Sequence, residues 1–149
     1  MAQLAAKIAS LRLPVRALPS RVVGVVVIVM LIAGATLGAQ AIRNVPRISI
    51  DELKTLMEQK AVLVIDVRDP ESFSKGRIPG AVNIDYTQVL KEGGKLAGET
   101  RTIVAYCACA NEMTAARAAV DLAAKGIPGA KALQGGWDEW VQRGEKIEK

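Results

Sequence analysis

The sequence predicts a small three-layer α/β domain with a mainly parallel sheet, preceded by one N-terminal transmembrane helix. After residue 48, short aliphatic runs alternate with helical segments, which is typical of parallel strands covered by helices on both faces. Before that point, a long stretch contains no charged side chain. The predicted organisation is a basic cytoplasmic segment at 1–21, a transmembrane helix or signal anchor at 22–42, a linker at 43–47 and the α/β domain at 48–149.

The uncharged segment 22–42 is long enough to cross a bilayer. As a helix it would reach about 32 Å at ~1.5 Å per residue, close to the ~30 Å thickness of the hydrocarbon core. Four basic residues precede it, which predicts a cytoplasmic N-terminus. In a bacterium the domain would then be anchored in the inner membrane and lie in the periplasm. Ala39-Gln40-Ala41 also resembles a signal-peptidase site that would release a secreted or periplasmic domain, but the apolar run is longer than the typical apolar h-region of a signal peptide and favours the anchor.

Charge and composition exclude several classes of function. All 15 acidic residues and 16 of the 20 basic residues lie after position 42, so that part carries a net charge of +1. The basic excess belongs to the leader and, with few aromatic residues, does not indicate nucleic-acid binding. The absence of histidine excludes Ser-His-Asp and Cys-His catalysis. Two cysteines are too few for a disulfide scaffold or a four-ligand zinc site, so no metal or cofactor is expected.

The elements of the domain follow from local patterns. Ser49 and Glu52 fit a capping box for a helix that ends near Gln59. The continuous aliphatic runs at 61–66 and 102–107 predict strands that are covered on both faces. The remaining expectations are brief strands at 81–84 and 130–133, a surface loop at 93–98, and helices at 70–74, at 86–90, at 114–125 and after Gly135-Gly136.

Cys107 and Cys109 lie between a predicted strand and a predicted helix. In parallel sheets, ligands bind beyond the carboxyl ends of the strands, where a helix N-terminus favours negative charge. Such a position favours the thiolate, which is the nucleophilic form of cysteine. Either cysteine alone is explained equally well as a small buried hydrophobic residue. Two cysteines in one loop favour a functional site.

Four sequence blocks, spread over residues 48–149, resemble the rhodanese family. The first is Val64-Ile65-Asp66-Val67-Arg68-Asp69-Pro70-Glu71-Ser72-Phe73, which continues into Gly76-Arg77-Ile78-Pro79-Gly80-Ala81-Val82-Asn83-Ile84. The others are Tyr106-Cys107, Ala116-Arg117-Ala118-Ala119, and Leu133-Gln134-Gly135-Gly136-Trp137 with Trp140. The resemblance implies a sulfurtransferase or persulfide carrier, in which a cysteine thiolate accepts sulfane sulfur from a donor and passes it to a thiol or cyanide acceptor.

The resemblance leaves two candidates for the catalytic cysteine, because the family's usual loop is two residues shorter when counted from the strand. Counting from the strand selects Cys107, and counting back from the helix selects Cys109. The helix N-terminus favours Cys109, with Cys107 as a resolving or supporting thiol. The expected substrate-binding loop comprises Ala108, Ala110, Asn111, Glu112, Met113 and Thr114, together with Arg117 in the following helix.

Other interpretations stay open. The loop lacks a cation and a glycine that are common in the family, and Glu112 adds negative charge, so the domain could be a catalytically inactive module that binds proteins. Cys107 and Cys109 could also form a thiol-redox or soft-metal site, although a one-residue spacer makes the ring strained. Phosphatase activity is disfavoured, since no arginine follows either cysteine by six residues. Asp66 and Arg68 are expected to support loop geometry as an ion pair.

Overall fold

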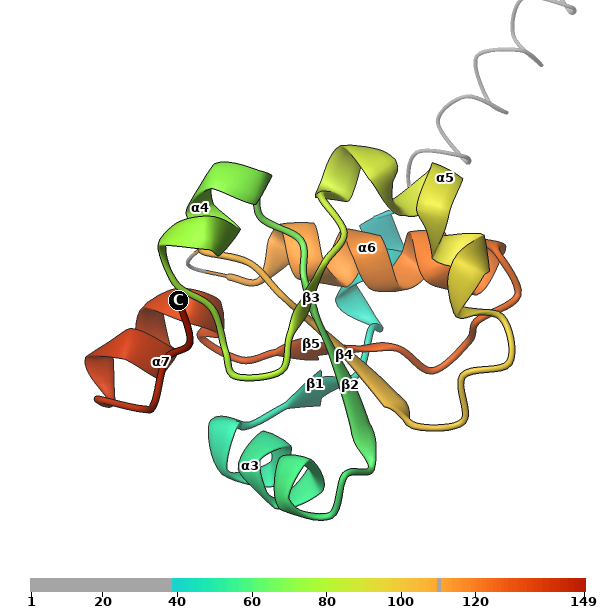
Figure 1. Ribbon diagram of the computed structural model, residues 1–149. Coiled ribbons are helices and arrows are strands. Elements are labelled where there is room, and N and C mark those ends of the chain that lie inside the picture. Colours follow the sequence, from blue (N-terminus) through green and yellow to red (C-terminus); the bar gives the residue numbers. More distant parts are fainter. Residues whose placement is uncertain (1–38, 110) are drawn as a thin grey trace, which may run out of the picture. The chain divides into compact units, whose positions relative to one another are not determined.

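The structure, a computed structural model, describes residues 39–109 and 111–149 (Figure 1). Most of the predicted membrane segment lies outside the described residues; its last four residues, 39–42, are helical. Among the helices that are described, none combines the length and the apolar character that a membrane crossing requires. The leader and its proposed cleavage site therefore remain predictions.

The described residues form one five-stranded sheet in the order β1-β5-β4-β2-β3, and every pairing in it is parallel. This confirms the predicted α/β domain with a parallel sheet. The strands are β1 (Arg47–Ile48), β2 (Val62–Asp66), β3 (Val82–Asn83), β4 (Thr102–Tyr106) and β5 (Lys131–Leu133). Strand β4 lies in the centre and pairs with β2 along its whole length, from Val62↔Thr102 to Asp66↔Tyr106.

Helices cover both faces of the sheet (Figure 1). They are α3 (Ile50–Glu58), α4 (Pro70–Lys75), α5 (Val89–Glu92), α6 (Met113–Ala124) and α7 (Gly136–Gln142), with short 3-10 turns η1 (Tyr86–Gln88) and η2 (Gly93–Leu96). Side chains of α5 and α6 join one hydrophobic cluster, and side chains of α3 and α7 join a second cluster on the opposite face.

The continuous aliphatic run of β2 follows from this double coverage. Leu63 and Ile65 belong to the cluster beneath α6, whereas Val62 and Val64 belong to the cluster beneath α3. Successive side chains of a strand point to opposite faces, so a strand buried on both faces needs apolar residues at every position.

Two elements differ from the sequence-based expectation. Strand β1 begins at Arg47, within the predicted linker, and η2 occupies the predicted surface loop. β1 has only two residues, too few for a periodic pattern, and it exists because it pairs with Ala132 and Leu133 of β5. The helix at 49–59 is confirmed, since Ser49 and Glu52 form both hydrogen bonds of the capping box of α3.

Candidate active site

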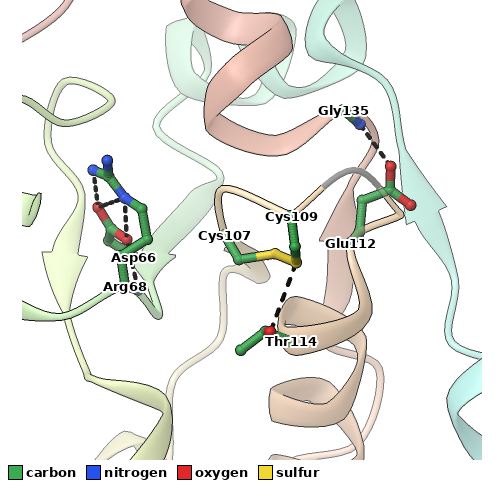
Figure 2. The surroundings of a disulfide bond; sticks show 7 residues. All are labelled: Asp66, Arg68, Cys107, Cys109, Glu112, Thr114 and Gly135. Carbon is green, nitrogen blue, oxygen red and sulfur yellow. Dashed lines mark hydrogen bonds and ion pairs between the residues drawn. A yellow bond between two sulfur atoms is a disulfide. The ribbon is translucent and has the colours of Figure 1, made fainter.

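A disulfide bond between Cys107 and Cys109 lies in the loop that connects β4 to α6 (Figure 2). Cys107 directly follows the central strand, and its side chain, 4% exposed, belongs to the hydrophobic cluster beneath α6. Cys109 is half-buried and packs against the same cluster. The bond therefore has one protected sulfur and one accessible sulfur, at the carboxyl edge of the sheet where ligands gather in folds of this kind.

Thr114 supplies a polar contact to the accessible sulfur. Its hydroxyl lies 3.6 Å from Cys109 Sγ, within range for donating a hydrogen bond (Figure 2). Thr114 belongs to the first turn of α6, whose unpaired N–H groups carry partial positive charge. When the disulfide is open, both features stabilise negative charge on Cys109 Sγ.

Glu112 closes the loop with a strained backbone and a fixed carboxylate. Its φ of 52° lies in the left-handed region, which is unfavourable for residues other than glycine. Its backbone N–H donates to the carbonyl oxygen of Cys109 at 3.1 Å. Its carboxylate accepts a hydrogen bond from the backbone N–H of Gly135 at 2.8 Å (Figure 2). A carboxylate is thereby held in place on the residue whose backbone N–H is bonded to Cys109.

The turn between β5 and α7 supports the loop from behind. The backbone N–H of Trp137 donates to the carbonyl oxygen of Cys107 at 2.9 Å. Gly136 has a φ of 52°, and a Cβ atom at this position would collide with that same carbonyl oxygen. The sequence indicated only that Gly135-Gly136 separates a strand from the last helix. Their adjacency was the only local signal for this close approach.

Asp66 is the centre of a buried polar cluster beside the loop. It is fully buried and accepts hydrogen bonds from Nε and Nη2 of Arg68 and from the Tyr106 hydroxyl. Arg68 also donates to the carbonyl oxygen of Gly76, and its guanidinium lies 4.2 Å from the centroid of the Trp137 ring. The expected ion pair between Asp66 and Arg68 is thus present, and it links β2 to the aromatic residue that follows the glycine turn.

Tyr106 and Arg68, the two titratable partners of Asp66, are each held in one protonation state by this cluster. Burial raises the pKa of the Tyr106 phenol, and the hydrogen bond to Asp66 and its charge raise it further. Burial opposes the charge of Arg68, but the hydrogen bonds and charge of Asp66 outweigh it and raise the pKa of the guanidinium. Tyr106 therefore remains a donor and Arg68 remains a cation at neutral pH.

The other expected loop residues surround the disulfide to different degrees. Ala108, Asn111 and Met113 are exposed, and Ala110 lies outside the described residues. Arg117 is exposed on α6 and makes no side-chain hydrogen bond or ion pair within the described part of the chain. The structure therefore brings Cys107, Cys109, Glu112 and Thr114 together, and leaves Arg117 outside their hydrogen-bonded group.

Comparisons with known proteins show similarity over most of the α/β domain. The family model described as "Rhodanese-like domain" matches residues 49–143. The chain is 28% identical to the thiosulfate sulfurtransferase GlpE of Shewanella oneidensis over 93 residues, which cover 62% of this chain and 89% of that protein. It is 32% identical to the protein of the same name from Pseudomonas syringae over 94 residues, covering 63% and 85%.

Solved structures show the same fold. The rhodanese-like domain of the Anabaena protein Alr3790 has a TM-score of 0.61 at 25% identity and covers 69% of this chain and 78% of that one. The human single-domain sulfurtransferase TSTD1 has a TM-score of 0.56 at 23% identity and covers 67% and 98%.

Proposed function

Since the chain belongs to the rhodanese-like domain family, we propose that it is a sulfurtransferase or persulfide carrier that moves sulfane sulfur through a loop cysteine to a thiol or cyanide acceptor. The observation that carries the proposal is the position of Cys107 and Cys109 between the central strand β4 and the N-terminus of α6. The similarity of the chain to two thiosulfate sulfurtransferases supports a transfer of sulfane sulfur as the reaction type.

Cys109 is the proposed carrier of the sulfur. Cys109 is half-buried and so is more open to a donor than Cys107, and the Thr114 hydroxyl lies 3.6 Å from its Sγ. The Cys107 side chain is only 4% exposed. An in-line approach of a donor to Cys107 would require the loop to open, whereas Cys109 needs no such change.

The charge at the loop bears on the choice of donor. The Glu112 carboxylate is held by Gly135, and Arg117 is not part of the hydrogen-bonded group around the cysteines. A doubly charged donor such as thiosulfate would be repelled by the Glu112 carboxylate, and among the described residues Arg117 does not join the hydrogen-bonded group to offset that charge. We propose that donors with less negative charge, such as the persulfide group of a protein thiol, are preferred.

The leader provides the proposed location. Residues 22–42 are proposed to anchor the chain in the inner membrane of a bacterium, with the domain in the periplasm. Release at Ala39-Gln40-Ala41 is the alternative outcome. A phosphatase-reporter fusion after Lys149, active only in the periplasm, tests the orientation. Fractionation of membranes separates an anchored chain from a cleaved one.

Intact-mass spectrometry of the full chain tests the proposed chemistry. The reduced chain and the variants Cys107→Ser and Cys109→Ser are each exposed to thiosulfate, to 3-mercaptopyruvate and to a polysulfide. Cys107→Ser is expected to gain the mass of one sulfur atom, and Cys109→Ser is expected to gain none. If no form of the chain accepts sulfur from any of the three donors, the sulfur-transfer proposal is wrong.

The disulfide itself favours a second candidate function, thiol–disulfide exchange with a partner protein. In that case the chain would lose two hydrogen atoms on oxidation and would never carry an added sulfur atom. The same mass measurement distinguishes the two candidates.

A further inference from the structure

We propose that Cys107 discharges the persulfide of Cys109 by forming the Cys107–Cys109 disulfide and releasing hydrosulfide. This inference rests on the proposed function, because it starts from a persulfide on Cys109. It adds a second activity, in which sulfane sulfur leaves the chain as sulfide instead of passing to an acceptor.

The geometry places the two sulfurs for this reaction. The structure shows them bonded to each other, with the Cα atoms of the two cysteines 5.6 Å apart, inside the range that disulfides adopt in proteins. The backbone of Cys107 is fixed by the hydrogen bond from Trp137 and by the close approach of Gly136. A Cys107 thiolate therefore stays within reach of the inner sulfur of a persulfide on Cys109.

The reaction balances without an added oxidant. The Cys107 thiolate donates an electron pair to Cys109 Sγ, the bond between the two cysteine sulfurs forms, and the bond to the outer sulfur breaks. The outer sulfur leaves with that electron pair as hydrosulfide, so the sulfane sulfur is reduced while the two cysteines are oxidised to the disulfide. A thiol reductant then restores both thiols before the next cycle.

Burial favours this direction. The Cys107 side chain lies among apolar residues of the cluster beneath α6. Removing a thiolate from water costs free energy, whereas the disulfide carries no charge. A Cys107 thiolate is therefore destabilised in this cluster, and its conversion to the uncharged disulfide removes that cost. The reductant reaches the disulfide through Cys109 Sγ, which is the accessible sulfur.

A single-turnover experiment tests the proposal. The full chain is reduced, freed of reductant and mixed with 3-mercaptopyruvate or thiosulfate, whose desulfurated products are pyruvate and sulfite and not sulfide. Sulfide is measured with an electrode, and the protein is weighed intact. The unmodified chain is expected to release about one sulfide per chain and to lose two hydrogen atoms.

The variants assign the roles. Cys107→Ser, and Cys107→Ala in case a buried hydroxyl disturbs folding, are expected to keep the added sulfur atom and to release no sulfide above the protein-free blank. Cys109→Ser is expected to do neither. Because the exchange is reversible, the oxidised unmodified chain in excess sodium sulfide is also expected to acquire one sulfur atom, and Cys109→Ser is not.

The outcomes separate this inference from the proposed function. If the unmodified chain and Cys107→Ser both keep a persulfide and release no sulfide, sulfur transfer stands and the discharge by Cys107 is wrong. If neither form ever gains a sulfur atom and no sulfide appears, the proposed function itself is wrong. If only Cys109→Ser keeps the sulfur, the roles of the two cysteines are reversed and the inference is overturned.

Discussion

The Glu112 carboxylate accepts a hydrogen bond from the backbone N–H of Gly135 at 2.8 Å, which joins the end of the cysteine loop to the N-cap residue of α7. This contact fixes a negative charge next to the sulfur-bearing site. The charge is set by the side chain, whereas the hydrogen bond needs only an acceptor oxygen. The two effects can therefore be separated by substitution.

Glu112→Gln keeps an acceptor oxygen for Gly135 and removes the charge. We expect its kcat/KM for thiosulfate to rise about fivefold, since the repulsion between one side-chain charge and an anionic donor near a protein surface is worth about 1 kcal/mol. Steady-state sulfite formation measures it. Asp121→Asn removes one charge near the far end of α6, away from the loop, and serves as the matched control. An equal rise in both variants would contradict a local effect of Glu112.

Gly136→Ala would place a methyl group against the carbonyl oxygen of Cys107, at a φ that disfavours side chains. We expect the loop to shift and sulfur transfer to fall by about 10- to 100-fold, because small displacements of reacting groups have large effects on rate. Single-turnover persulfide formation measures it. Gly94→Ala is the matched control, since a Cβ at Gly94 meets no atom within 4 Å. Persulfide formation at the unmodified rate in Gly136→Ala would show that the glycine turn does not position the loop.

Tyr106→Phe would leave an oxygen of the buried Asp66 without its phenolic donor. We expect the free energy of unfolding at neutral pH to fall by about 1–3 kcal/mol, because the buried backbone N–H of Ile78, which donates to the Tyr106 hydroxyl, would lose its acceptor. Chemical denaturation measures it. Refolding yield and circular dichroism check that the variant keeps the fold.

The same residue predicts a pH dependence. The pKa of Tyr106 is raised above its ordinary value of 10.0, chiefly by burial, so the native state keeps the phenolic proton at pH values where the unfolded chain loses it. This contribution to stability is complete below pH 10 and is lost as the pH rises towards the native pKa. The stability gap between the unmodified chain and Tyr106→Phe should therefore narrow above pH 10. A constant gap across this range would contradict the raised pKa.

Opening the disulfide should change stability only slightly. Its cysteines are separated by two positions, and closing so small a ring removes little entropy from the unfolded chain, worth about 1–2 kcal/mol. Thermal unfolding with and without a thiol reductant measures the difference, and Cys109→Ser, which has no disulfide to reduce, should show none. Complete unfolding on reduction would mean that the bond is structural.

The sequence predicted the parts of this fold that depend on local patterns. The aliphatic runs of β2 and β4 and the capping box of Ser49 are confirmed. Each depends only on residues that lie close together in the sequence. Strand β1 was not predicted, because it forms only by pairing with β5, more than 80 positions later in the chain.

The candidate site also combines features that the local sequence predicts with contacts between distant residues that it does not. The position of Cys107 and Cys109 between a strand and a helix was predicted from order along the chain, whereas the central place of that strand in the sheet was not. The contact between Glu112 and Gly135, and the donation from Tyr106 to Asp66, join residues 23 and 40 positions apart. No local pattern encodes such pairings, since they arise only when the strands assemble side by side.

The small ring formed by Cys107 and Cys109 has a consequence for turnover. The sulfur–sulfur bonds that form and break in the proposed cycle all lie in one loop. This loop joins the central strand β4 to helix α6, which packs on the sheet. Oxidation and reduction can then alternate without a domain movement or a refolding step. In the proposed cycle, the pace would depend on collisions with donor and reductant, and so on the concentrations of those molecules in the surrounding compartment.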